Sequence, residues 1–169
     1  MEVLASGTGW SRRGILLALT AAAAGAHRLF AQAGQTPAPE SAFSIPEDAR
    51  LLPADLSKQL NAAGSPKAAL FQVGSRVFFA QAHIPGSVYA GPGSREEGLK
   101  LLGEKTAGLA KDQAIVLYCG CCPWERCPNI APAWRQLKQQ GFSNLRALMM
   151  EHNFGDDWVA KGYAGERGQ

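Results

Sequence analysis

An unbroken apolar run constrains the fold more than any other stretch of this sequence. Ala114, Ile115, Val116, Leu117 and Tyr118 follow one another with no alternation of polar and apolar side chains. A strand of this kind is covered by other elements on both faces, which is typical of the centre of a parallel sheet. The run therefore predicts a buried central strand of an α/β domain.

Short apolar runs alternate with helical periodicities on both sides of this strand. Further strands are expected at residues 51–52, 68–73, 88–90 and 145–148, and helices from Pro53 to the stop at Gly64, over 95–110, from Asn129 to Gly141 and around 156–161. Ser94 and Glu97 form the pattern of a capping box, and Asn129 is suited to cap the third helix. The alternation predicts an α/β fold with a doubly wound, largely parallel sheet and right-handed crossovers.

The first 33 residues have the pattern of a twin-arginine export signal. Arg12 and Arg13 precede an apolar run over residues 15–26, and small residues at 31–33 offer a cleavage point. The run is shorter than the ~20 residues that span a bilayer, which favours a removed leader over the alternative of an uncleaved anchor. We therefore expect a periplasmic protein with no stable membrane span after the signal is removed.

After residues 1–33, the predicted organisation is a proline-containing linker over residues 34–47 and a single domain over residues 48–169. Residues 34–169 hold 14 basic and 13 acidic side chains, so most of the net charge of +3 belongs to the leader. The basic residues are scattered singly and form no cluster with aromatic residues. This pattern excludes nucleic acid as an expected partner.

All four cysteines of the chain lie within nine residues, directly after the predicted central strand. They are Cys119, Cys121, Cys122 and Cys127. A disulfide framework would distribute its cysteines to connect distant loops, so this cluster points to local chemistry. In doubly wound sheets ligands bind outside the carboxyl ends of the strands, where Cys119 is expected to lie.

The position of Cys119 predicts a nucleophile. A loop that leads from a strand into a helix brings together free backbone N–H groups and the positive end of the helix dipole, which favour an anion. We therefore expect a thiolate of lowered pKa at Cys119, with Arg126 as the cationic side chain of the loop that contacts an anionic substrate. The alternative is that Cys119 is a small buried apolar residue that ends the strand.

The residues around this cysteine resemble the rhodanese-homology domain family over roughly residues 48–165. The resemblance is carried by Tyr118-Cys119 and its anion-binding loop, the helix that ends with Leu137 and Gly141-Phe142, the segment His83-Ile84-Pro85-Gly86-Ser87, and the closing Trp158 and Gly162-Tyr163. The segment that begins at His83 is the most specific of these. At the position of His83 the family pattern is structural rather than catalytic.

The resemblance implies a sulfurtransferase with Cys119 as the catalytic cysteine. Cys119 would take a sulfane sulfur from a small sulfur-containing anion such as thiosulfate and pass it from a persulfide to a thiol or cyanide-like acceptor. The predicted substrate-binding residues are Arg126, Gly120, Cys121, Cys122 and Trp124, with backbone N–H groups of residues 120–127 around the anion and Trp124 at the mouth of the pocket. The prediction includes no cofactor and no metal.

Three departures from the family pattern weaken the expectation of efficient thiosulfate turnover. The stretch from Cys119 to Gly141 is about five residues longer than usual. Gln72-Val73-Gly74 stands where the family often has Asp-x-Arg, and residues 149–153 replace a pair of glycines.

The three remaining cysteines leave several interpretations open. Cys121, Cys122 and Cys127 could be resolving thiols of a thiol-redox or sulfur-relay protein. With His152 they could supply soft ligands for Cu(I) or Zn, although adjacent cysteines are unlike the paired ligands of structural zinc sites. A disulfide between Cys127 and either Cys121 or Cys122 would only hold the loop together. A non-catalytic interaction domain of the same fold is a further alternative.

Overall fold

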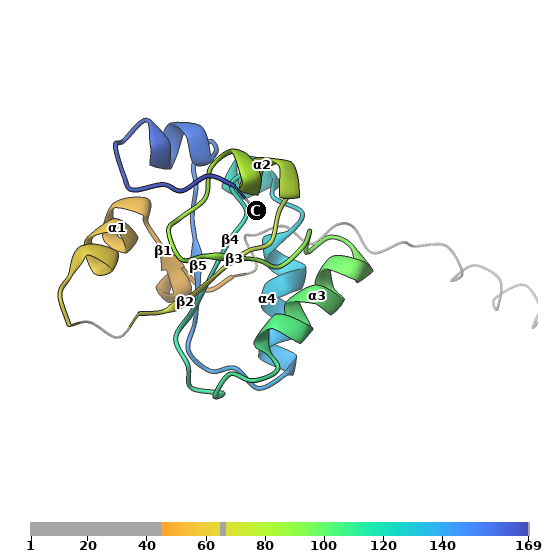
Figure 1. Cartoon of the computed structure of the whole chain (residues 1–169). Helices are drawn as coiled ribbons and strands as arrows, with labels where there is room; N and C mark the ends of the chain where they lie inside the picture. Colours follow the sequence, from red (N-terminus) through yellow and green to blue (C-terminus); the bar gives the residue numbers. More distant parts are fainter. Residues whose placement is uncertain (1–44, 65–66, 169) are drawn as a thin grey trace, which may run out of the picture. The chain divides into compact units, whose positions relative to one another are not determined.

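The structure is a computed structural model that describes residues 45–64 and 67–168 (Figure 1). In this part of the chain, five parallel strands form one sheet in the order β1-β5-β4-β2-β3. The strands are β1 (Arg50–Leu51), β2 (Ala69–Gln72), β3 (Val88–Tyr89), β4 (Ile115–Tyr118) and β5 (Leu145–Leu148). The predicted parallel α/β sheet is confirmed, and the apolar run forms its central strand, β4.

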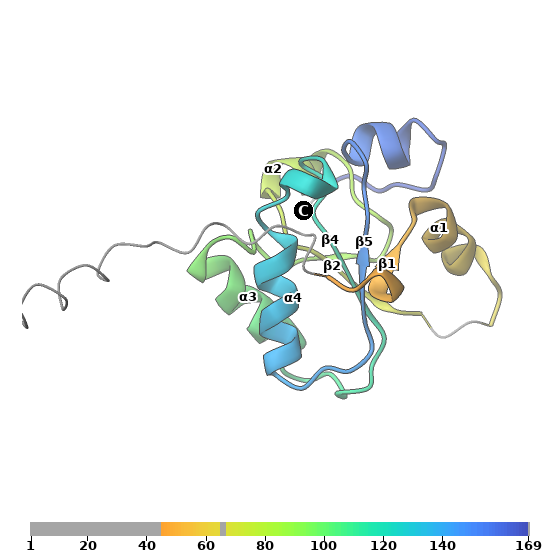
Figure 2. The same cartoon turned by 180° about the vertical axis from the view of Figure 1, so that it is seen from behind.

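Helices cover both faces of the sheet. They are α1 (Pro53–Asn61), α2 (Arg76–Gln81), α3 (Glu96–Thr106) and α4 (Ile130–Gln139), with the shorter segments η3 (Glu47–Ala49), η4 (Trp124–Arg126) and η5 (Gly155–Val159). Helices α3 and α4 lie side by side on one face, and α1 and η5 lie on the other (Figures 1 and 2). This arrangement is the predicted doubly wound one.

The side chains of β4 alternate between two hydrophobic cores. Ile115 and Leu117 point to the core under α3 and α4, whereas Val116 and Tyr118 point to the core under α1 and η5. All four residues are buried, because successive side chains of a strand leave opposite faces of the sheet and both faces are covered.

Two details of the helices differ from the predictions. Helix α2 was not predicted; it begins after Ser75, whose hydroxyl accepts a hydrogen bond from Val77 N at 3.3 Å, and it contributes Phe79 to the interior. Six residues are too few to show a helical period in the sequence. The capping box at α3 is wrong, because the helix begins after Arg95 and its start carries no side-chain cap.

The segment at residues 83–87 is tied to the end of β4. Ile84 N donates a hydrogen bond to the Tyr118 hydroxyl at 3.2 Å, and the Ser87 and Tyr118 hydroxyls are 2.7 Å apart. Burial raises the pKa of Tyr118 to about 12. His83 Nδ1 lies 2.9 Å from Phe79 O and its ring stacks on Phe79, so the histidine has structural contacts.

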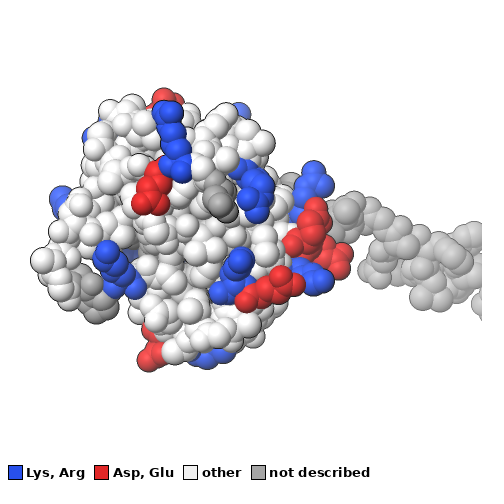
Figure 3. Space-filling model, in the orientation of Figure 1, with Lys and Arg blue, Asp and Glu red and all other residues white. Residues whose placement is uncertain are grey.

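The predicted leader, residues 1–33, and most of the predicted linker lie outside the described residues. Ile45, which falls within the range predicted as linker, is fully buried in the core under α4. Among the described helices, none has the length and apolar character needed to cross a membrane. Charged side chains are dispersed over the face shown in Figure 3 rather than gathered in a basic patch.

Candidate active site at the cysteine loop

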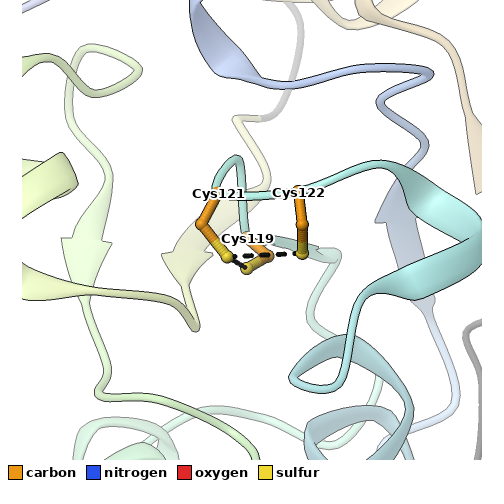
Figure 4. Close-up of side chains that lie close together, drawn as sticks. All are labelled: Cys119, Cys121 and Cys122. Atoms are coloured by element: carbon orange, nitrogen blue, oxygen red, sulfur yellow. Dashed lines mark hydrogen bonds between the residues drawn. The ribbon is translucent and has the colours of Figure 1, made fainter.

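Three thiols converge beneath the loop that follows β4. Cys119 comes directly after the strand and is 4% exposed, whereas Cys121 and Cys122 are half-buried. The Sγ atoms of Cys119 and Cys121 are 3.0 Å apart, and those of Cys121 and Cys122 are 3.4 Å apart. Figure 4 shows the three side chains pointing toward one another. The four cysteines of the described chain are free thiols in this structure.

The loop can turn in this way because of Gly120. Its φ is +77°, a conformation that residues with a side chain rarely adopt. A Cβ atom here would lie 2.9 Å from the Cβ of Phe154, and Phe154 N donates a hydrogen bond to Gly120 O at 3.0 Å. Gly120 therefore lets the backbone pass closely against the segment before η5 and return Cys121 toward Cys119.

Hydrogen bonds within the cluster shift the pKa values of Cys121 and Cys119 in opposite directions. A hydrogen bond from the Cys119 thiol is the largest cause that lowers the pKa of Cys121, to about 6. Hydrogen bonding with the neighbouring thiols, first of all Cys121, and then burial raise the pKa of Cys119 well above its usual value. The raised pKa of Cys119 is the opposite of the lowered pKa that was expected for this thiol.

The N-terminus of helix α4 lowers the pKa of Cys127, whereas Cys119 was the cysteine expected to be affected. The pKa of Cys127 is lowered to about 7, mainly by a hydrogen bond with Cys119 and further by the backbone N–H groups of Asn129 and Ile130. These N–H groups open the helix, where free donors and the dipole favour an anion. These N–H groups lie after the predicted cradle of residues 120–127, and they act on Cys127, which is 3% exposed.

Asn129 was predicted to cap helix α4, but in the structure its side chain belongs to the cysteine site. Its side chain does not cap α4. Instead, Nδ2 donates to Cys119 Sγ at 3.3 Å, and Oδ1 accepts from Ser94 N at 3.0 Å. The amide therefore connects the cysteine to the loop before α3. The one available signal was the position of this amide, two residues after the last cysteine.

Gln72 fills the place of the missing charged residue of the family pattern. It is 2% exposed, its Nε2 donates to Cys119 O at 3.0 Å, and its Oε1 accepts from Gly74 N at 3.1 Å. A Cβ atom at Gly74 would lie 3.0 Å from Cys119 Sγ. The end of β2 therefore holds the backbone of Cys119 by neutral hydrogen bonds. This backbone is held in place although the charged residues of the family pattern are missing.

A hollow of about 400 Å³ opens beside Cys121. It is lined by Phe78, Gln81 and Ala82 at α2, Gly120 and Cys121 in the loop, and Asn153, Phe154, Gly155 and Val159 near η5. Apart from Cys121, whose pKa is lowered, these side chains carry no ionisable group. Cys121 is the cysteine among them, so a molecule that enters this hollow meets Cys121 before the buried Cys119.

Two predicted substrate contacts lie elsewhere. Trp124 is 6% exposed and lines a cavity of only about 10 Å³ on the inner side of the loop, so it is not at the pocket mouth. Arg126 is exposed on η4 and does not line the hollow. Both differences arise because the longer loop forms η4, which turns Trp124 inward and Arg126 outward.

His152 does not join the cysteines. It is exposed, and its Nδ1 lies 3.3 Å from Asp157 Oδ1. The group of close ligand atoms in the described chain consists of the sulfurs of Cys119, Cys121 and Cys122, which all lie within 4.8 Å of one another. The structure therefore brings together three of the four predicted cysteines as one group, with Cys127 hydrogen-bonded to Cys119.

Comparisons with known proteins agree with this architecture. A family model described as a rhodanese-like domain matches residues 52–150, which is more than half of the chain. No match is found among curated proteins.

Solved structures with similar folds come from two bacteria. The BH2092 protein from Bacillus halodurans has 21% identity and a TM-score of 0.54, with 70% of this chain and 76% of that chain covered. The Alr3790 protein from Anabaena sp. has 20% identity and a TM-score of 0.53, with 69% and 82% covered. A solution structure of the rhodanese-like domain of Alr3790 has 19% identity and a TM-score of 0.52, with 70% and 79% covered. At these identities the likeness establishes the fold.

Proposed function

This chain belongs to the rhodanese-like domain family, and we propose that it is a sulfurtransferase that carries a sulfane sulfur as a persulfide on Cys119. The observation that supports this most directly is the 3.0 Å distance between the Sγ atoms of Cys119 and Cys121. It pairs a nucleophile at the end of β4 with a neighbouring base. Nucleophilic catalysis needs such a base within hydrogen-bonding distance.

In the proposed first step, the Cys121 thiolate accepts the proton of the Cys119 thiol. The Cys119 sulfur then attacks the outer sulfur of the donor and forms a new S–S bond. The S–S bond of the donor breaks, and its electron pair leaves with the remainder, which is sulfite when thiosulfate is the donor. The products are the Cys119 persulfide anion, a protonated Cys121 and sulfite, so charge and atoms balance.

Asn129 and Gln72 support this step in different ways. The amide of Asn129 donates to Cys119 Sγ and so stabilises negative charge on this sulfur as the proton leaves. Gln72 binds Cys119 O and holds the backbone of the nucleophile in place. In the second step, the acceptor thiolate attacks the outer sulfur of the persulfide, and Cys119 leaves as a thiolate that regains its proton from Cys121.

The hollow beside Cys121 favours one kind of sulfur donor over another. Apart from Cys121, its lining side chains carry no ionisable group, and several of them, including Phe78 and Val159, are apolar. A dianion such as thiosulfate gains little from such a surface, whereas a hydropersulfide with an apolar organic body is partly desolvated there at low cost. We therefore expect loading from an organic hydropersulfide to exceed loading from thiosulfate.

A thiol-redox function is the second candidate, and the same sulfur pair favours it. The Cys121 thiolate could attack the inner sulfur of the Cys119 persulfide, which forms a Cys119–Cys121 disulfide and releases hydrosulfide. The two sulfurs need to approach from 3.0 Å to about 2.05 Å for this bond. In this case Cys121 is the resolving thiol.

Intact mass spectrometry tests the proposal. The reduced protein is incubated without oxygen with thiosulfate or an organic hydropersulfide, alongside the Cys119→Ser, Cys121→Ser and Cys127→Ser variants. A gain of one sulfur, about 32 Da, that is lost in Cys119→Ser and slowed in Cys121→Ser supports the proposed transfer. A loss of two hydrogens without added sulfur supports the thiol-redox candidate.

Two results would contradict a sulfurtransferase with Cys119 as carrier. Loading that persists in Cys119→Ser and disappears in Cys121→Ser assigns the persulfide to Cys121. No loading from either donor in a folded protein assigns the chain to the non-catalytic interaction domains of this fold. Circular dichroism of each variant verifies that the fold is retained.

A further inference from the structure

We propose that the cluster of Cys119, Cys121 and Cys122 is a binding site for one Cu(I) ion. The proposal does not depend on sulfur transfer. It rests on the arrangement of the sulfur atoms, on a small cavity next to them, and on the absence of other ligand types from the cluster in the described part of the chain.

The spacing of the three sulfur atoms fits a three-coordinate ion. Two of the distances are 3.0 and 3.4 Å, and all three sulfurs lie within 4.8 Å of one another. A trigonal set of ligands about 2.3 Å from a metal has its sulfurs about 4.0 Å apart. The thiols therefore need to separate by less than about 1 Å each to admit an ion. The close-up in Figure 4 shows that all three already point to one space.

A second feature lies directly inside the loop. A cavity of about 10 Å³ is lined by Cys119, Cys122 and Cys127 together with Met150. Trp124 and Leu148 are among its other lining residues, and its walls carry no carboxylate or imidazole. Thiolate and thioether sulfurs are soft ligands that select Cu(I), zinc or iron–sulfur clusters over hard cations. The space around the cluster is therefore chemically suited to a soft ion.

Coordination number favours Cu(I) over zinc. Structural zinc sites use four ligands in a tetrahedron. The close group in the described chain contains three sulfurs, and Cys127, although it lines the adjacent cavity, is not part of this group. The nearest histidine in sequence, His152, is exposed and paired with Asp157.

Binding of Cu(I) changes no oxidation state. The ion forms three Cu–S bonds, and the thiol protons of the cluster leave to solvent. The bound ion occupies the sulfur of Cys119 that would carry a persulfide, so one molecule can hold either the ion or the sulfane sulfur. Cu(I) binding and sulfur loading are measured in different experiments, so the failure of one does not imply the failure of the other.

The test uses the full chain, reduced and free of metal, under anaerobic conditions. Cu(I) is supplied as its complex with the chelator bathocuproine disulfonate, and the protein is titrated into it while the absorbance of the chelator complex is followed. We expect transfer of one Cu(I) per chain. The Cys122→Ser variant should bind about 100-fold more weakly, because one of three metal–sulfur bonds is lost.

Two variants serve as matched controls. His152→Ala removes the neighbouring imidazole that lies outside the cluster and should leave the affinity unchanged. Cys127→Ser removes a thiol outside the close group and should weaken binding less than Cys122→Ser does. The proposal is overturned if no Cu(I) leaves the chelator, if Cys122→Ser binds as tightly as the unmodified chain, or if His152→Ala weakens binding as much as Cys122→Ser.

X-ray absorption of the loaded, unmodified chain keeps the test valid if a variant fails to fold. Three sulfur ligands at a single short distance support the site. Two or four sulfur ligands, or any nitrogen ligand, contradict it. Uptake of Zn²⁺ in a parallel titration, together with no uptake of Cu(I), would assign the cluster to zinc and also overturn the proposal.

Discussion

Asn129 donates its side-chain N–H to the sulfur of Cys119 over 3.3 Å, while its other side-chain atom accepts a hydrogen bond from Ser94 N. One amide therefore stabilises charge on the cysteine and fixes the loop before α3. The two tasks use different atoms, so a substitution that keeps the oxygen and removes the donor can separate them.

The Asn129→Asp variant makes this separation. Aspartate retains an acceptor for Ser94 N but replaces the donor with a negative charge beside the thiols, which disfavours their ionisation. We expect the apparent pKa of the fastest-reacting thiol to rise by about one unit, measured as the pH dependence of iodoacetamide alkylation. Asn144→Asp is the control, since Asn144 is exposed and far along the sequence from the cluster. An unchanged pH profile in Asn129→Asp would show that this amide has no electrostatic effect on the cluster.

The unmodified protein should itself show which cysteine reacts at low pH. A thiolate is the reactive form, so a lowered pKa moves the rise in alkylation rate to lower pH. With a pKa of about 6, Cys121 should be modified increasingly as the pH rises from about 5 to 7. Cys119 should be modified more slowly than Cys121 at neutral pH because its pKa is raised and it is buried. Peptide mapping by mass spectrometry identifies the modified residue.

The Cys121→Ser variant provides the control for this experiment. It removes the half-buried thiol of low pKa, so the reaction below pH 7 should largely disappear. Cys127 should not replace it, because a pKa of about 7 does not make a side chain with 3% exposure accessible. Rapid modification of Cys119 at pH 6 in the unmodified chain would contradict the raised pKa of this thiol.

Gly120→Ala should destabilise the fold and disturb the cysteine loop. The substitution places a side chain at φ +77° and a Cβ atom 2.9 Å from Phe154. We expect a loss of about 2–3 kcal/mol in the free energy of unfolding, measured by urea denaturation. Gly108→Ala is the matched control, because a Cβ atom there meets nothing within 4 Å, and it should change stability by less than about 0.5 kcal/mol. Equal effects of the two substitutions would show that the close approach at Gly120 is not required.

The fold was predictable from the sequence because its main signals are local. The run at residues 114–118 is continuous and apolar, which is sufficient to identify a strand covered on both faces. The spacing of apolar residues identified the helices that became α1, α3 and α4. Helix α2 is too short for a period to be recognised, and it was missed although it provides one wall of the hollow beside Cys121.

The site was predictable only in part, since its supporting contacts are distant in sequence. The position of Cys119 follows from the end of a predicted strand. Gln72 is 47 residues from Cys119, and Asn129 is 35 residues from Ser94. No pattern in the chain indicates such pairs before the strands are placed side by side. The direction of the thiol pKa shifts was also hidden, because it depends on which sulfur donates and which accepts.

Gln72→Glu should destabilise the protein in a way that depends on pH. The substitution keeps the shape of the side chain but removes the donor to Cys119 O and buries a carboxyl group at a position of 2% exposure. Burial raises the pKa of such a carboxyl above the unfolded value of about 4.3, so the folded state binds the proton more tightly. Stability relative to the unmodified chain is therefore highest below pH 4 and is lost as the pH rises through the folded pKa.

At pH 7 we expect Gln72→Glu to lose about 3 kcal/mol or more in the free energy of unfolding, and clearly less at pH 4. Urea denaturation at both pH values measures this difference. Gln113→Glu is the control, because Gln113 also donates to a backbone carbonyl, Ala114 O at 3.4 Å, but is partly exposed, so its carboxylate stays hydrated. Two results would contradict this: a loss of unfolding free energy in Gln72→Glu that does not depend on pH, or an equal loss in Gln113→Glu. Either would show that the amide at position 72 is not required for its hydrogen bond to Cys119 O. The expected result would instead establish that a neutral amide at the end of β2 performs the support that a charged pair provides in the usual family pattern.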